Sequence, residues 1–166
     1  MFTAVNTGSV LTAVEALTAS CQDRGWSTRT IQGSVTFVRL LVESEHGPLL
    51  IDLAVDVAPS RPPIRTAVGP AFDPEELAGR KLIALFDRAE ARDFADVYLL
   101  SQRFGRQALL DRAAEVDLGF DTAVLAQMMR GLGRFDDDEI PIDPGLVESV
   151  RRDFAEWADA LDGRNP

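Results

Sequence analysis

The stretch that decides the fold is GRKLIALFDRAEARDFADVYLLSQRFG, Gly79 to Gly105, because it holds two consecutive segments with the apolar periodicity of a helix. Successive residues of a helix turn by about 100°, so Lys81, Leu85 and Arg88 share one side of the first predicted helix. Two cations on a side that also carries apolar residues have two explanations. Their stems cover apolar surface while their heads reach water, or a negatively charged group meets them there.

The second predicted helix carries charges at neighbouring positions. Arg92 and Asp96 are four residues apart and Asp93 and Asp96 are three apart, so these side chains adjoin on one helix. One interpretation is a surface ion pair, which adds little stability. The other is a carboxylate that converges with Lys81 on a phosphate or a metal ion. The pattern alone leaves both open.

Upstream of these two predicted helices, the runs SVTFVRLLVES and PLLIDLAVDVA are rich in β-branched and apolar residues and predict a β-hairpin. We expect Glu45 to pair with Pro48 across the turn. One face of the hairpin is then wholly apolar, and the other collects Arg39 and Asp52, which lie diagonal to each other. A slip of one residue would exchange the two faces, so we expect the register to be well specified.

Two carboxylates lie on the polar face of the second strand. At about 3.3 Å per residue, Asp52 and Asp56 are roughly 13 Å apart, so one metal ion cannot bind both. Asp52 is the better candidate, because a carboxylate in the middle of an apolar strand is costly without a partner. The alternative is that Arg39 is simply that partner.

The remaining pattern predicts an α+β protein, with a small mixed or antiparallel sheet, a flanking helix and a C-terminal helical bundle. The flanking helix precedes Gly25, and Cys21 is expected in its core face. Helices are expected near residues 74–88, 92–104, 106–116, 121–133 and 144–162. We predict an α/β part over residues 1–72 and a helical part over 73–166, packed together as a single compact unit.

Composition excludes several function classes. The 166 residues carry a net charge of -10, with -4 on residues 1–79, +2 on 80–112 and -8 on 113–166, so a uniformly basic nucleic-acid binder is excluded. One cysteine and one histidine exclude a disulfide within the chain and zinc sites rich in histidine. We expect no membrane segment or signal peptide, and a cytoplasmic location.

Most of the chain resembles a known family. From Ser34 onwards, the order LLIDLAVDVAP, DPEELAGRKLIALFDRAEARDFADVYLL and FAEWADAL is similar to the AbiEii/AbiGii-type nucleotidyltransferase toxins. The most specific part is a lysine, here Lys81, followed by AL..R...RDF.DVY.L. The resemblance implies a polymerase-β-like nucleotidyltransferase core followed by helices. It also implies the toxin of a bacterial toxin–antitoxin or abortive-infection pair, and transfer of a nucleotide to the 3′ end of tRNA.

The resemblance also implies roles for single residues. Lys81 would hold a triphosphate oxygen of the incoming nucleoside triphosphate. Asp96, together with Asp93, would act as base or orienting carboxylate. Arg88 and Arg92 would contact phosphates or support these groups. The implied partners are a nucleoside triphosphate, tRNA and a cognate antitoxin protein.

For the metal site, the resemblance implies Mg²⁺ held by Asp52 as the third carboxylate, borne on a strand. The family's principal metal pair is a D-x-D strand after a Gly-Ser turn. The two Gly-Ser pairs of this sequence, in TGSV and QGSV, have no D-x-D after them. A two-metal site needs several carboxylates, so we expect the chain as given to be inactive in nucleotide transfer. The alternative function is a remnant without catalytic activity that serves as a protein-interaction domain.

Overall fold

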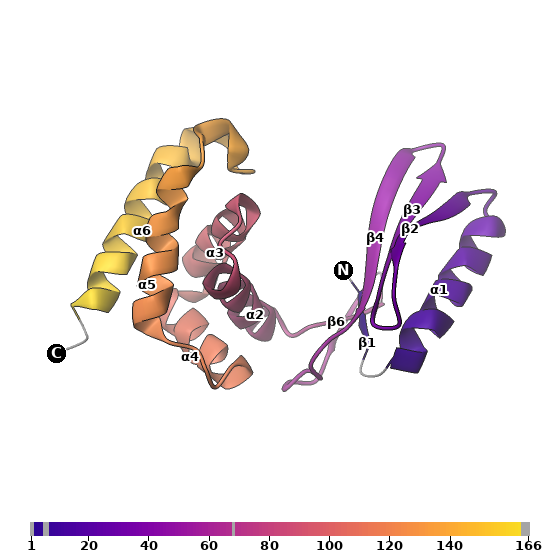
Figure 1. The fold of residues 1–166 in the computed structure, drawn as a ribbon, viewed down its shortest axis with the longest axis horizontal. Helices are drawn as coiled ribbons and strands as arrows, with labels where there is room; N and C mark the ends of the chain where they lie inside the picture. Colours follow the sequence, from indigo (N-terminus) through magenta and orange to yellow (C-terminus); the bar gives the residue numbers. More distant parts are fainter. Residues whose placement is uncertain (1, 5–6, 68, 164–166) are drawn as a thin grey trace. The chain divides into compact units, whose positions relative to one another are not determined.

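The computed structural model describes residues 2–4, 7–67 and 69–163. The chain groups into two compact units, Met1–Ala58 and Pro59–Pro166, which we call the sheet unit and the helical unit (Figure 1). The first holds the main sheet and the second holds the helical bundle, so the predicted α+β class is confirmed. The predicted packing of residues 73–166 onto residues 1–72 stays a prediction.

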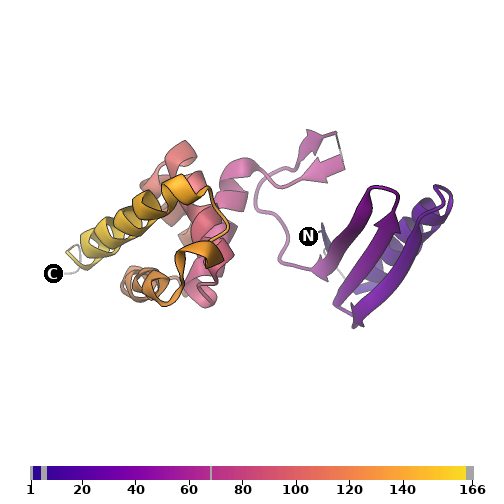
Figure 2. The ribbon, with the colours of Figure 1, turned by 90° about the horizontal axis from the view of Figure 1, so that it is seen from above.

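The sheet unit has four strands and one helix: β1 (Phe2–Ala4), α1 (Thr7–Gln22), β2 (Ser27–Gly33), β3 (Phe37–Ser44) and β4 (Gly47–Val55). The strand order is β1-β4-β3-β2, in which β1 runs parallel to β4 and the other pairs are antiparallel. The sheet is therefore mixed, as expected. Helix α1 covers one face of it, which Figure 2 shows from above.

The hairpin register differs from the expected one by two residues. Ser44 pairs with Gly47, and Arg39 therefore lies directly opposite Asp52. The expected pairing of Glu45 with Pro48 is wrong, because Gly47 adopts a φ of 103° and closes a two-residue turn one position earlier in the chain. A shift of two residues keeps each side chain on its face, so the predicted apolar and polar faces are retained.

The core of the sheet unit lies between α1 and the apolar face of the hairpin. Val10, Val38, Leu40 and Leu53 are buried there. Cys21 is buried as predicted, near the end of α1.

The helical unit begins with a proline-rich segment that forms a small hairpin, β5 (Ile64–Thr66) and β6 (Gly69–Ala71). Five α-helices follow, within about three residues of the predicted ranges: α2 (Pro74–Asp87), α3 (Ala91–Phe104), α4 (Arg106–Val116), α5 (Thr122–Arg130) and α6 (Val147–Asp162). Short 3-10 turns, η1 (Gly131–Arg134), η2 (Asp137–Glu139) and η3 (Pro144–Leu146), connect the last two. Among the described residues, no helix has both the length and the apolar character needed to cross a membrane.

The bundle core is built around aromatic side chains. The buried ring of Phe94 from α3 meets Phe154 from α6 edge to face, with ring centroids 5.1 Å apart. Trp157 stacks on Phe154 one turn further along α6. Phe135 approaches Phe94 from the segment after α5. These contacts tie α3 and the connection after α5 to the last helix.

Helix α2 packs closely against α4 at Gly79. A Cβ atom added to Gly79 would lie 2.5 Å from Cβ of Arg112 and 2.8 Å from its carbonyl carbon. Neither atom can move without moving the α4 backbone, so only glycine fits here.

We predict that Gly79→Ala destabilises the protein by about 1–2 kcal/mol, because the cost of overpacking exceeds the gain in helix propensity. Urea unfolding followed by circular dichroism measures the change. Gly133→Ala is the control, since a Cβ there meets no atom within 4 Å. Equal or greater stability of Gly79→Ala would contradict the close packing.

Candidate functional site

The first pair of predicted site residues meets between adjacent helices. Nζ of Lys81 in α2 donates a hydrogen bond of 2.6 Å to Oδ2 of Asp96 in α3. The Lys81 side chain is 36% exposed and that of Asp96 is 40% exposed. The lysine head thus neither points freely into water nor enters the core. A paired cation and carboxylate stand together at the edge of the bundle, within reach of a solute.

The second pair lies at the turn from α2 to α3. Arg88 donates from Nε and Nη2 to the two carboxylate oxygens of Asp93, each at 2.9 Å. Asp93 is fully buried, whereas the Arg88 side chain is 45% exposed. Asp93 also accepts the backbone N–H of Glu90 at 3.1 Å. The carboxylate therefore fixes both the start of α3 and the direction of the Arg88 guanidinium.

Burial and pairing act in opposite directions on Asp93. Burial alone would raise the pKa of Asp93, but the hydrogen bonds and charge of Arg88, with the N–H of Glu90, lower it below its ordinary value. The pKa of Arg88 is raised, chiefly by its hydrogen bonds to Asp93. Both groups are therefore ionised in the folded protein at neutral pH.

Arg92 stands beside this turn and is exposed. It pairs with Glu90 at 2.8 Å, while Asp96, its neighbour four residues on, accepts from Lys81 instead. Arg92 and Asp96 are therefore not each other's partners, although each lies in an exposed ion pair, as the first interpretation expected of these charges. Arg92 presents its guanidinium on the same turn as Arg88.

Asp52 lies in the sheet unit and has a partner of its own. Arg39 donates from Nε to Oδ1 at 2.7 Å and from Nη2 to Oδ2 at 2.8 Å. The hydrogen bonds to Asp52 raise the pKa of Arg39. The alternative drawn from the sequence, that Arg39 is the partner of this carboxylate, is confirmed.

The donor set does not fit the implied Mg²⁺ site. Both carboxylate oxygens of Asp52 are engaged by Arg39. Within residues 2–4, 7–67 and 69–163, no three Asp, Glu, His or Cys side chains gather closely enough to hold a metal ion. Mg²⁺ takes six oxygen ligands, usually from one or two protein carboxylates together with waters and substrate phosphates. The role of Asp52 as a metal ligand therefore stays a prediction without support from its surroundings.

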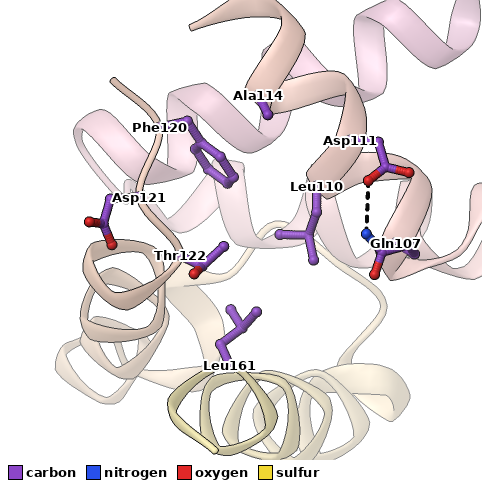
Figure 3. Close-up of a pocket in the computed structure, with 8 residues that line it drawn as sticks. All are labelled: Gln107, Leu110, Asp111, Ala114, Phe120, Asp121, Thr122 and Leu161. Atoms are coloured by element: carbon purple, nitrogen blue, oxygen red, sulfur yellow. Dashed lines mark hydrogen bonds between the residues drawn. The ribbon is translucent and has the colours of Figure 1, made fainter. Parts of the chain in front are cut away.

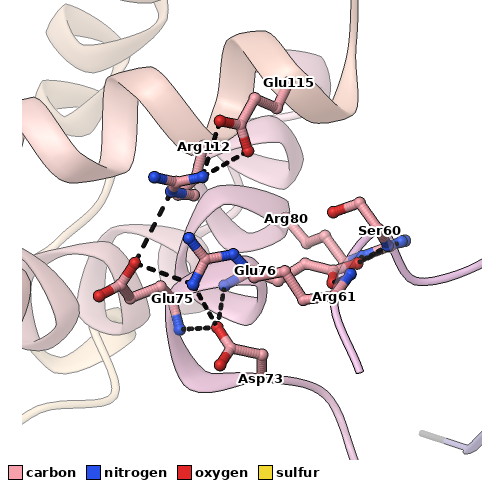
Figure 4. Close-up of polar contacts among 8 residues, drawn as sticks. All are labelled: Ser60, Arg61, Asp73, Glu75, Glu76, Arg80, Arg112 and Glu115. Atoms are coloured by element: carbon pink, nitrogen blue, oxygen red, sulfur yellow. Dashed lines mark hydrogen bonds and ion pairs between the residues drawn. The ribbon is translucent and has the colours of Figure 1, made fainter. Parts of the chain in front are cut away.

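The sequence pattern missed a second buried carboxylate, Glu76. Its side chain is 1% exposed and accepts from the backbone N–H groups of Ser60 and Arg61 and from Arg80 (Figure 4). In the sequence, Glu76 is one of two acids in the first turn of a helix. Only its inward orientation shows that it anchors the segment leading into α2.

Charges around this anchor form one network. Arg61 pairs with Asp73 at 3.3 Å and with Glu75 at 3.1 Å, and Arg112 from α4 pairs with Glu115 (Figure 4). Asp73 caps α2, accepting from the N–H groups of Glu75 and Glu76. This network holds the end of α2 that lies farthest from Arg88.

A shallow pocket of about 460 Å³ opens elsewhere in the helical unit, between α4, α5 and α6 (Figure 3). Leu110, Phe120 and Leu161 point into it, and Gln107 and Asp111 bond to each other on its rim. None of the six predicted site residues lines this pocket. Its lining carries no group suited to phosphate chemistry, so it is not the candidate site.

The pairing of Asp93 gives a prediction about pH. Because its pKa is lower in the folded than in the unfolded protein, Asp93 stabilises the fold above about pH 4, and this contribution is lost as pH falls through the lowered value. We expect Asp93→Asn to cost about 2–3 kcal/mol at pH 7, since a charged acceptor of three hydrogen bonds is lost. The variant should also lose less stability than the wild type between pH 5 and about pH 2.

Urea unfolding across this pH range measures both effects. Asp96→Asn is the matched control on the same helix, where an exposed ion pair contributes at most about 1 kcal/mol. Equal pH dependence in Asp93→Asn and wild type would contradict the structural role of this carboxylate.

Comparison with known proteins identifies the family of the chain. No curated protein and no solved structure matches the chain. The sequence profile of the family described as "Nucleotidyl transferase AbiEii toxin, Type IV TA system" matches residues 8–165, nearly the whole chain. That range covers most of both units and includes all six predicted site residues. The chain therefore belongs to the AbiEii family of nucleotidyltransferase-like toxins of toxin–antitoxin systems.

Proposed function

We propose that this chain binds a nucleoside triphosphate at Lys81 and Asp96, and that this site, once completed by the metal-binding D-x-D carboxylates that the sequence lacks, serves nucleotide transfer to an RNA acceptor, the 3′ end of tRNA. The observation that carries the proposal is the contact of 2.6 Å between these two side chains, both partly exposed. An antitoxin belongs to the same system, and the cytoplasm, where tRNA and nucleotides occur, is the proposed location.

The pair offers two complementary functions. A triphosphate oxygen can replace Asp96 as the partner of the Lys81 ammonium, because both are anionic oxygens of similar reach. The carboxylate released in this way can accept a proton from an acceptor hydroxyl. The hydroxyl oxygen then bonds to the α-phosphorus, the bond from that phosphorus to the leaving pyrophosphate breaks, and the proton goes to Asp96.

The neighbouring turn supports phosphate binding. Arg88 and Arg92 present guanidinium groups there, and a guanidinium suits the geometry of phosphate oxygens. Asp93 is fully buried and cannot meet a substrate. We assign it the orienting role, because it holds Arg88 by two hydrogen bonds.

One observation favours the second candidate function, a protein-interaction domain without catalysis. Asp52 is bound by Arg39 at both oxygens, and a metal-dependent transfer would need that carboxylate. In this reading the chain keeps the family's fold, and its partner is a protein such as the antitoxin.

Measuring nucleotide binding distinguishes the two candidate functions. We predict that Lys81→Ala raises the Kd for ATP, GTP, CTP or UTP, measured by calorimetry, roughly ten-fold or more, the loss expected for a charged hydrogen bond. Arg130→Ala is the matched control, because Arg130 is also a partly exposed helical cation, paired with Asp159 and Asp162. It should change the Kd by less than about two-fold.

Failure of the wild-type chain to bind any of the four triphosphates, or equal losses in both variants, would overturn the nucleotide site. Stable association with an antitoxin protein in that case would favour the interaction domain.

A further inference from the structure

The turn that carries Arg88 is a strained piece of backbone. Helix α2 ends at Asp87, α3 begins at Ala91, and the residue between Arg88 and Glu90 is Ala89, with a φ of 47°. This left-handed conformation is unfavourable for any residue with a Cβ atom. Ala89 is also fully buried. Such a turn persists only where surrounding contacts hold it.

One of those contacts comes from a distant part of the chain. Nη2 of Arg134, the last residue of η1, donates to the carbonyl oxygen of Arg88 at 3.3 Å and also to that of Ala89. These carbonyls follow the C-terminal end of α2, where a positive charge is favourable. Arg134 thus stabilises the turn by hydrogen bonds and by its charge.

Arg134 is itself held in place. Its guanidinium carbon lies 4.7 Å from the centroid of the Phe135 ring, and that ring packs against Phe94 in the bundle core. Arg151 of α6 donates to the carbonyl oxygens of Leu132 and Phe135 on either side. The donor that meets the turn therefore sits on a segment fixed to α6.

We propose that Arg134 is a positioning residue for phosphate binding, acting through Arg88. Arg134 holds the Arg88 backbone and Asp93 holds the Arg88 side chain. Fixed at both ends, the guanidinium of Arg88 is pre-organised to receive a phosphate oxygen of the nucleotide. This inference rests on the proposed function, because it concerns the same nucleotide site.

The test compares triphosphate binding in Arg134→Gln, Arg134→Lys and Arg130→Gln, using the full chain and ATP as the probe. We expect Arg134→Gln to raise the Kd roughly three- to ten-fold, as for one or two lost hydrogen bonds. Arg134→Lys, which keeps the charge and a donor, should stay within about two-fold of the wild type. Arg130→Gln removes a cation that contacts neither the turn nor Arg88, so it should leave the Kd unchanged.

A double-mutant cycle separates positioning from a general effect on the fold. If Arg134 acts through Arg88, Arg134→Gln should add nothing to the loss in Arg88→Gln. A purely structural role would reduce the affinity by the same factor in both backgrounds, and that result would overturn the proposal. A wild-type Kd in Arg134→Gln would overturn it as well.

A second readout needs no nucleotide. The Nε–H of Arg88, bonded to Asp93, should exchange with solvent faster in Arg134→Gln than in the wild type or Arg130→Gln, as measured by NMR. Unchanged exchange would overturn the proposal while leaving the nucleotide site intact. If Lys81→Ala weakens ATP binding and Arg134→Gln does not, the proposed function holds and this inference fails. If the wild type binds no triphosphate, both fail.

Discussion

The ion pair between Arg88 and the buried carboxylate of Asp93 is the contact on which the helical unit depends. A carboxylate without access to water must be compensated in full, and here two hydrogen bonds from one guanidinium and one from a backbone N–H do so. The pair sets where α2 stops and α3 starts. It thereby sets the relative position of the two helices that bear Lys81 and Asp96, which meet at 2.6 Å.

The two ion pairs differ in a way that matters for function. Asp93 is closed off from solvent, while Lys81 and Asp96 are each more than a third exposed. A solute can compete for the second pair but not for the first. The helical unit therefore has one ion pair that is fixed, Arg88 with Asp93, and one whose partner can be exchanged, Lys81 with Asp96. This arrangement suits a site that must bind a charged ligand and release it. In the sheet unit, Asp52 and Arg39 form a third pair, and membership of the AbiEii family does not by itself supply the carboxylates that a metal site would need.

Local sequence patterns predicted the elements well and the contacts between them less well. Apolar periodicity located the helices, and strand alternation assigned the correct faces of the hairpin. The register was wrong by two residues, since the conformation of Gly47 decides the turn and alternation is blind to an even shift. The meeting of Lys81 with a carboxylate of the next helix was one of two interpretations left open by the sequence, because helical periodicity describes one helix and Asp96 lies on the next. Glu76 and Arg134 were missed for a related reason: each accepts from or donates to backbone groups of a distant segment, whose positions no side-chain pattern records.

The most direct measurement uses the fact that Lys81 is the only lysine of the chain. Labelling lysine with ¹³C and ¹⁵N gives a single Nζ signal in NMR spectra. Titration with a nucleoside triphosphate then reports on this ammonium alone. If the account is right, the Lys81 signal shifts saturably as the triphosphate replaces Asp96, and Asp96→Asn alters its starting position. A signal that stays fixed through the titration, while the protein remains folded, would contradict the assignment of Lys81 and Asp96 as the nucleotide site.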